Sequence, residues 1–184
     1  IEWFDSRISE AEKVAGIPVG TLGLEVQIES AKGLMNVEAI AGASRRIETL
    51  VLGPADLIAS LGMNTLVVGE QPPGYDADAY HYIFMRLIVA ARAHDLQVLD
   101  GPYLAIKDLD ALRKASARVA ALGFDGKWAV HPTQIDVINE VFSPSQTDFD
   151  KAEAILEAYE HATSSAGGHK GAVMLGEEML DEAS

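Results

Sequence analysis

A pair of carboxylates is the feature of this sequence best suited to chemistry. Glu29 directly follows the strand-like run 24–28, and Asp56 follows a second such run, 50–52, after a Gly-Pro-Ala turn. Parallel α/β proteins build their sites at the carboxyl ends of strands. If the two strands are neighbours, the two carboxylates can share one hard divalent cation. The spacing also allows a simpler interpretation, in which Glu29 begins a helix and Asp56 caps one.

Two further segments could contact a substrate. Gly53, Pro54 and Ala55 precede a short predicted helix, and the free N–H groups at a helix start attract anions. A plain strand-to-helix turn explains the same residues equally well. His131 and Pro132 end the last predicted strand, where a lone histidine is more often structural than catalytic.

Asp100 and Lys127 also lie at predicted strand ends. Buried charges need partners, so we expect these two to support a site rather than to touch a substrate.

Composition narrows the class of protein. The 184 residues are 48% hydrophobic and 23% charged, as in an ordinary globular domain. A net charge of −14 makes nucleic acid or an anionic membrane an unsuitable partner. The absence of cysteine excludes disulfides and thiolate chemistry. Without an apolar run of about 20 residues or a signal pattern, we expect a cytoplasmic protein without a membrane partner.

Strands and helices alternate along the chain. Ser9 and Glu12 form a capping-box pattern for a short first helix that ends at Gly16. A long loop is predicted over 62–75, and a loose tail follows the glycine pair at 167–168. The predicted strands are one that ends at Ile28 and three that cover 49–52, 96–99 and 127–130. The other predicted helices cover 31–45, 54–61, the segment from Asp76 to about His94, 108–122, 133–142 and 147–163.

Strands separated by helices imply parallel pairing. The chain length favours an open flavodoxin-like sheet, because eight-stranded barrels need about 250 residues. The first strand favours a barrel instead: Glu25, Gln27 and Glu29 share one face, as the two-residue period requires. A sheet covered on both faces would rarely carry three polar groups there, whereas a barrel with a ligand on its axis can.

Five motifs, which occur in a fixed order along the chain, resemble those of a known protein family. They are Gln27-Ile28-Glu29-Ser30-Ala31-Lys32-Gly33-Leu34, Gly53-Pro54-Ala55-Asp56-Leu57, Asp100-Gly101-Pro102-Tyr103, the segment 123–135 and Met179-Leu180-Asp181. Together they resemble the HpcH/HpaI aldolase and citrate lyase beta-subunit superfamily, and within it the malyl-CoA, methylmalyl-CoA and citramalyl-CoA lyases. The resemblance covers essentially the whole chain.

The resemblance implies a (β/α)8 TIM barrel of which this chain is roughly the C-terminal half. Residues 1–165 would belong to the barrel and 166–184 would form a lid or tail. The family's first strands and its substrate-orienting arginine would precede Ile1. The implied activity is Mg2+-dependent carbon–carbon cleavage of a 3-hydroxyacyl-CoA into acetyl-CoA or propionyl-CoA and glyoxylate or a related 2-oxo acid, with Mn2+ as a substitute ion.

The resemblance also implies residue roles. Glu29 and Asp56 would bind the metal, the segment 53–55 the substrate carboxylate, and the His131–Pro132 loop the acyl-CoA. Asp181 lies where a frayed terminus is ordinarily expected. In the lyases, however, an aspartate in a Met-Ile-Asp-like motif closes over a neighbouring subunit's site as general acid or base, and Met179-Leu180-Asp181 differs only by Leu for Ile.

Two other functions compete with the lyase. One is a class II aldolase acting on free 2-keto-3-deoxy acids, against which the acidic tail and the Gly-Pro-Ala-Asp motif argue. The other is a non-catalytic scaffold or a partial subunit that completes a site with another chain. Half a barrel would expose strand edges and apolar surface, so we expect either that more chain exists or that partners cover this surface. The family resemblance favours a homotrimer or homohexamer.

Overall fold

The computed structural model describes residues 1–65 and 67–183 and divides the chain into two compact units, Ile1–Phe142 and Ser143–Ser184. The first unit contains α1 (Glu2–Ala15), β1 (Leu24–Ile28), α2 (Ala31–Met35), α3 (Val37–Ala41), β2 (Ile47–Leu52), α4 (Pro54–Leu61), α5 (His81–Arg92), β3 (Gln97–Asp100), α6 (Leu109–Leu122), β4 (Gly126–Lys127), the 3-10 helix η1 (Pro132–Gln134) and α7 (Ile135–Phe142). The second contains α8 (Gln146–Thr163), β5 (Val173–Leu175) and β6 (Glu178–Leu180).

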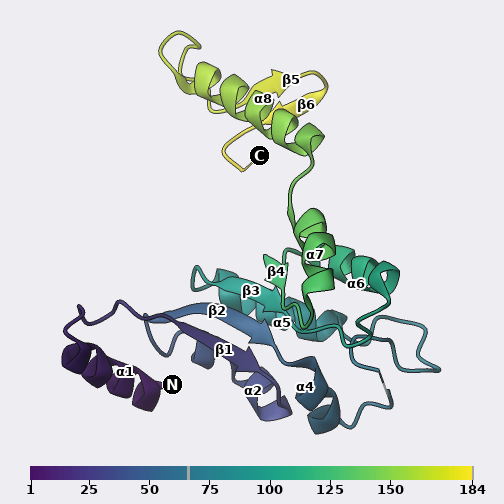
Figure 1. Ribbon diagram of the computed structural model, residues 1–184. Helices are drawn as coiled ribbons and strands as arrows, with labels where there is room; N and C mark the ends of the chain where they lie inside the picture. The colour runs from purple at the N-terminus through teal and green to yellow at the C-terminus, as the bar shows by residue number, and fades with distance from the viewer. Residues whose placement is uncertain (66, 184) are drawn as a thin grey trace. The chain divides into compact units, whose positions relative to one another are not determined.

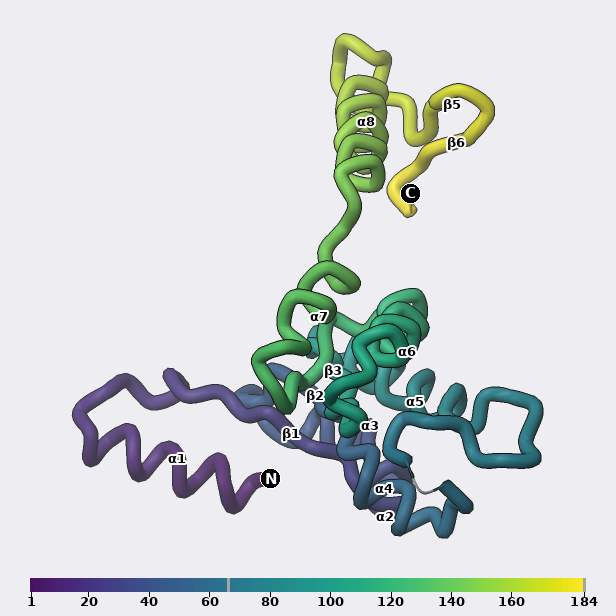
Figure 2. Tube along the Cα trace, turned by 45° about the vertical axis from the view of Figure 1, so that its right-hand side comes forward, coloured from purple at the N-terminus to yellow at the C-terminus, as the bar shows by residue number. Residues whose placement is uncertain are grey.

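A parallel sheet in the order β1-β2-β3-β4 forms the centre of the first unit (Figure 1). The predicted α/β class and parallel pairing are therefore confirmed. Several predicted elements differ. The helix expected over 31–45 is two short helices that meet at Asn36, the helix expected from Asp76 begins at His81, and the last strand is Gly126–Lys127 rather than 127–130. Figure 2 shows α7 alongside α6, the helix that precedes β4.

One face of the sheet packs against helices. Alternate strand residues such as Ile28, Leu50 and Val98 are at most 1% exposed and join one core with apolar side chains of α3, α4 and α5. The opposite face of β1 carries Glu25 and Gln27, which are exposed. The alternation read from the sequence therefore holds in the structure, and Glu29 comes next on the same polar side.

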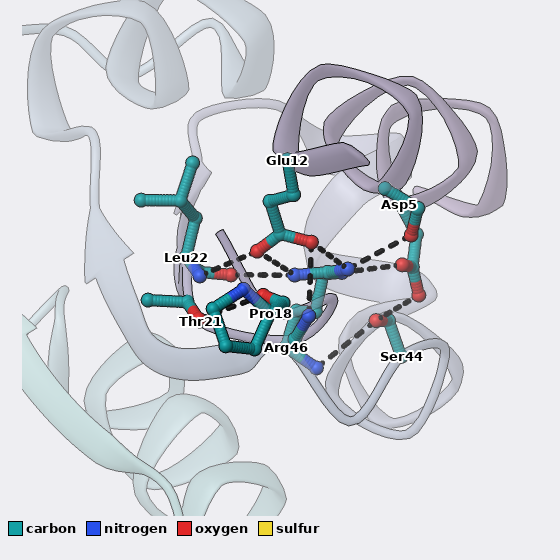
Figure 3. A network of polar contacts seen from close by, with 9 residues as sticks. Asp5, Glu12, Pro18, Thr21, Leu22, Ser44 and Arg46 are labelled. Atoms are coloured by element: carbon teal, nitrogen blue, oxygen red, sulfur yellow. Dashed lines mark hydrogen bonds and ion pairs between the residues drawn. The ribbon is translucent and has the colours of Figure 1, made fainter. Parts of the chain in front are cut away.

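A buried guanidinium joins α1 to the amino end of β2 (Figure 3). Arg46 donates to both oxygens of Glu12, at 2.9 and 2.6 Å, and to Asp5 Oδ1 at 2.6 Å. Glu12 is fully buried and also accepts the Leu22 N–H at 2.8 Å. The capping-box interpretation of Ser9 and Glu12 is wrong: α1 begins at Glu2, and both side chains are mid-helix partners of Arg46.

The Glu12–Arg46 contact predicts a specific acid sensitivity. Hydrogen bonds from Arg46 hold the pKa of Glu12 at about 2, below its ordinary 4.5. The ionised carboxylate therefore stabilises the folded protein above pH 4.5, and this contribution is lost as the pH falls from 4.5 towards 2. Urea unfolding of Glu12→Gln should show a stability deficit at neutral pH that shrinks across this range. A deficit independent of pH contradicts the assignment, and Glu10→Gln, which breaks an exposed pair with Arg7, serves as the control.

The second unit is more ordered than the tail expected from sequence. After α8 the chain forms an antiparallel hairpin in which Val173 pairs with Leu180. Leu180 is 3% exposed, and α8 contacts β5. The predicted division between residues 165 and 166 lies inside this unit, because the hairpin groups with α8; the division into barrel and lid stays a prediction.

No helix within residues 1–65 and 67–183 has the length and apolar character needed to cross a bilayer.

Candidate active site

Glu29 and Asp56 lie at the carboxyl ends of two neighbouring strands. In the β1–β2 ladder Ile28 pairs with Leu52, so Glu29 and Gly53 are the next residues on the two strands. Asp56 stands in the first turn of α4, three residues beyond Gly53 in the sequence, and both acidic side chains are exposed. The structure thus places both predicted metal ligands at the same edge of the sheet.

Gly53 brings the two segments into close contact. A Cβ built on Gly53 would lie 2.5 Å from Glu29 Cβ and 2.6 Å from Gln27 Nε2, distances that real Cβ atoms do not show. The Gly53 N–H also donates to Ile28 O at 2.9 Å. Only glycine therefore lets the β2–α4 turn pass directly beside the Glu29 side chain.

This contact predicts that Gly53→Ala damages the site more than the fold. The added methyl group must displace Glu29 and Gln27, and overpacking of this kind costs about 1–3 kcal/mol. We expect weaker Mg2+ binding by calorimetry, with a smaller relative change in thermal stability. Gly62→Ala, at the other end of α4, has open space around its Cβ position but strains a left-handed backbone (φ 67°), so it is the control for destabilisation of this helix away from the two carboxylates. Unchanged metal affinity in Gly53→Ala would argue against the close contact being functional.

At the start of α4, the three predicted substrate-binding residues differ in whether their backbone N–H is free to bind an anion. Gly53 uses its N–H within the sheet, and Pro54 at the first helical position has none. Ala55 is therefore the residue of the three whose N–H could bind an anion. Pro54 is buried while Ala55 is exposed, which agrees with this division.

The His131–Pro132 loop is held from beneath by a glutamine that the sequence analysis missed. Gln134 is fully buried; its Oε1 accepts the Val130 N–H and its Nε2 donates to Tyr103 O, both at 2.9 Å. His131 is exposed and caps η1, accepting the Thr133 N–H through Nδ1 at 3.3 Å. The capping contact supports the structural interpretation of this histidine, and substrate contact by His131 or Pro132 stays a prediction. In the sequence Gln134 lies between Thr133 and Ile135-Asp136, and these neighbours give no local sign of its burial.

Asp100 and Lys127, which end β3 and β4, pair with each other. They are register partners, and Lys127 Nζ lies 2.5 Å from Asp100 Oδ2. The two side chains are 4% and 9% exposed for Lys127 and Asp100 respectively. Each of these buried charges thus has a partner, as expected, and their role in supporting a site stays a prediction.

Asp181 directly follows β6 in the second unit, where its Oδ1 accepts the Ala183 N–H at 2.9 Å. It is half-buried and follows the buried Leu180. The residue therefore has a defined local backbone, unlike a frayed terminus. Its catalytic role stays a prediction.

The carboxylates fit magnesium better than a metal held by protein alone. Within residues 1–65 and 67–183, no group of three or more His, Asp or Glu side chains is arranged to hold an ion. Mg2+ keeps several water or substrate ligands and is commonly bound through one or two carboxylates. Glu29 and Asp56 supply oxygen donors of that number and kind, both exposed at the strand ends.

The structure is a parallel α/β sheet with two exposed carboxylates at the ends of adjacent strands. The family profile described as HpcH/HpaI aldolase/citrate lyase matches residues 1–132, and the chain belongs to this family.

The chain is also similar to individual proteins of this family. The L-malyl-CoA/beta-methylmalyl-CoA lyase of Cereibacter sphaeroides is 36% identical over 173 residues, which are 89% of this chain and 54% of the relative. A malyl-CoA/beta-methylmalyl-CoA/citramalyl-CoA lyase of Chloroflexus aurantiacus is also 36% identical, over 85% of this chain and 47% of its own. The CitE protein of Mycobacterium tuberculosis, solved in complex with magnesium and pyruvate, is 28% identical with a TM-score of 0.60 over 81% of this chain and 61% of that one. The chain thus spans about half the length of these curated relatives.

Proposed function

We propose that the protein containing this chain is a Mg2+-dependent lyase that reversibly cleaves a malyl-CoA-like 3-hydroxyacyl-CoA into acetyl-CoA or propionyl-CoA and a 2-oxo acid. The observation that carries the proposal is the position of Glu29 and Asp56 at the ends of adjacent parallel strands, with Gly53 packed against Glu29. The named activities of the relatives in Cereibacter and Chloroflexus support the substrate class, and the magnesium in CitE supports the ion.

The architecture proposed for the whole protein is a closed (β/α)8 barrel. Consecutive strand order with crossover helices is the pattern of a barrel, whereas a doubly wound sheet reverses its order at a switch point. Edge strand β1 also borders an open hollow of about 300 Å3 lined by Ile1, Phe4, Leu24 and Val26 among others. Additional strands would cover this edge, with residues 1–165 in the barrel and 166–184 as the lid.

In the proposed reaction some residues bind the metal and the substrate, and another transfers a proton. Glu29 and Asp56 would hold Mg2+, which supplies Lewis-acid polarisation of the 2-oxo acid carbonyl when bound. The Ala55 N–H at the start of α4 would bind the carboxylate of that acid. As the C2–C3 bond breaks, the 3-hydroxyl becomes the carbonyl of the 2-oxo acid and loses its proton to water. Asp181, closing over the site of a neighbouring subunit, would protonate C2 of the acyl-CoA half, and would remove that proton in the condensation direction.

An exposed apolar hollow supports the proposed homo-oligomer. It has a volume of about 440 Å3 and lies between α2, α4, α5 and the loop before α5. Met35, Leu61 and Tyr82, which line it, are 69%, 41% and 62% exposed. Apolar surface of this kind is typical of subunit contacts. A trimer or hexamer should appear in sedimentation, and Tyr82→Glu should shift it towards smaller species.

The activity is tested by product identification. The protein is incubated with Mg2+, acetyl-CoA or propionyl-CoA, and glyoxylate or pyruvate, and the adduct is identified by mass. We expect a malyl-CoA-type adduct that disappears with EDTA and returns with Mg2+ or Mn2+. A second assay contains free pyruvate and an aldehyde without a CoA ester. An adduct formed only in this second assay would indicate the aldolase instead, and no adduct in either assay would favour the scaffold.

A further inference from the structure

The ion pair between Lys127 and Asp100 has contacts that connect it to the metal-binding segment. Asp100 uses both carboxylate oxygens: Oδ2 lies 2.5 Å from Lys127 Nζ, and Oδ1 accepts the Gly101 N–H at 2.8 Å. Asp100 O in addition accepts the Trp128 N–H at 3.0 Å. The pair therefore fixes the turn that leaves β3 at the point where Gly101 begins it.

That turn rests directly on the start of α4. A Cβ on Gly101 would lie 2.3 Å from Leu52 O and 2.2 Å from Pro54 Cδ, so only a glycine fits there. Leu52 ends β2, and Pro54 is the first residue of the helix that carries Asp56. The backbone at Gly101 thus forms one wall against which the β2–α4 turn is placed.

The pair lies on the helix side of the sheet rather than on the polar face. Leu50 pairs with Val98, and both belong to the core shared with the helices; Asp100 follows Val98 by two residues and so points the same way. Asp100 and Lys127 line a small cavity of about 20 Å3 together with Pro54. Asp100 and Lys127 can therefore support the site from the helix-covered face of the sheet, whereas Glu29 lies on the polar face.

Stability alone gives little reason for such a pair. The cost of removing two charges from water often exceeds their attraction, and apolar replacements of similar volume are frequently neutral or stabilising. A role in placing a neighbouring segment accounts for the buried charges better.

We propose that Asp100 and Lys127 are a positioning pair: they hold Gly101 against Leu52 and Pro54 and so set the position of Asp56 at the metal site. The inference rests on the proposed function and deepens it. The pair acts on metal affinity through the β2–α4 turn, without touching metal or substrate.

The test compares variants by calorimetric Mg2+ titration and by steady-state kinetics in the natural protein. Asp100→Asn with Lys127→Met removes both charges at similar volume. We expect Mg2+ binding about 10- to 100-fold weaker, the usual effect of losing a group that orients a metal ligand. KM for acyl-CoA should change little, while kcat at fixed Mg2+ falls. Lys127→Arg keeps the charge and should retain near-original affinity.

Matched controls come from the opposite end of the same two strands. Asp125, at the amino end of β4, accepts the Val98 N–H at 2.7 Å and the Arg92 guanidinium at 2.8 Å, which repeats the chemistry of the Asp100 pair. Asp125→Asn with Arg92→Gln should leave Mg2+ affinity unchanged. If the Asp100/Lys127 double variant does not fold, the milder Asp100→Asn with Lys127→Gln provides the same comparison.

Each outcome decides between the inference and the function on which it rests. Original Mg2+ affinity in a folded Asp100/Lys127 variant overturns the inference, and so does an equal loss in the Asp125/Arg92 control. Asp56→Asn is titrated in parallel. If Asp56→Asn binds Mg2+ normally, the metal site itself is wrong and the inference falls with it. If only Asp56→Asn loses affinity, the proposed function stands and the positioning pair does not.

Discussion

Asp56→Asn is expected to lower Mg2+-dependent cleavage by at least about 100-fold, because Lewis-acid stabilisation by a metal is worth several kcal/mol and each 1.36 kcal/mol is a factor of ten. The amide keeps the size of the side chain but loses the charge that binds the ion. Asp56 is exposed in the first turn of α4, so its loss should leave the core intact. Calorimetry should show the matching loss of Mg2+ affinity.

The control for Asp56 is an acidic residue in an equivalent local setting. Asp136 lies in the first turn of α7 and is exposed, so Asp136→Asn removes a similar interaction with a helix amino end. We expect Asp136→Asn to lower the stability by about 0.3–1 kcal/mol and to leave turnover unchanged. Equal activity of the two variants would show that Asp56 does no more than favour its helix.

Asp181→Asn should separate binding from catalysis. A positioned general acid or base contributes about 10²- to 10⁴-fold, so turnover should fall by that order. KM for the CoA ester should stay near its original value, because the carboxyl group is assigned to proton transfer rather than to binding. Its place directly after β6, beside the buried Leu180, gives the side chain a defined origin.

Proton exchange gives a second measurement for Asp181. If the residue removes the C2 proton of acetyl-CoA, Asp181→Asn should abolish deuterium incorporation from D2O into acetyl-CoA, followed by mass. Glu182→Gln, the exposed neighbouring carboxylate, should leave exchange and turnover unchanged. Full exchange in Asp181→Asn would assign the proton transfer to another group.

Local sequence patterns predicted much of the fold. The alternation of Leu24, Val26 and Ile28 with polar residues indicated a strand with one polar face, and its observed burial alternates in the same way. The helix predicted over 108–122 is observed as α6, with Asp108 as its N-cap and Gly123 as a left-handed C-cap. These signals are local, since they depend on side-chain period and backbone conformation within a few residues.

Long-range partners were not predictable in the same way. Ser9 and Glu12 match a capping box, yet Arg46, more than thirty positions later, pairs with both in the fold. The hairpin β5–β6 lies in a segment rich in glycine and acidic residues, which resembled a loose tail. In both cases packing between distant segments outweighs the local preference.

The candidate site divides along the same line. The strand-end positions of Glu29 and Asp56 could be read from the sequence, because each follows an apolar run. The glycine contacts that arrange them could not: Gly53 beside Glu29 and Gly101 beside Pro54 depend on which strands are neighbours. The sequence therefore predicted Glu29 and Asp56 as ligands, and the fold adds the close glycine contacts around them.

The most direct test of the account is to locate the ion. Crystals of the protein grown with Mn2+ and a 2-oxo acid, measured at the manganese absorption edge, would place the metal independently of any assay. We predict one anomalous peak between Glu29 and Asp56, about 2.0–2.2 Å from an oxygen of each, close to the distances of octahedral Mg2+ sites. A peak bound by other residues, or bound by only one of these two carboxylates, would contradict the shared metal site.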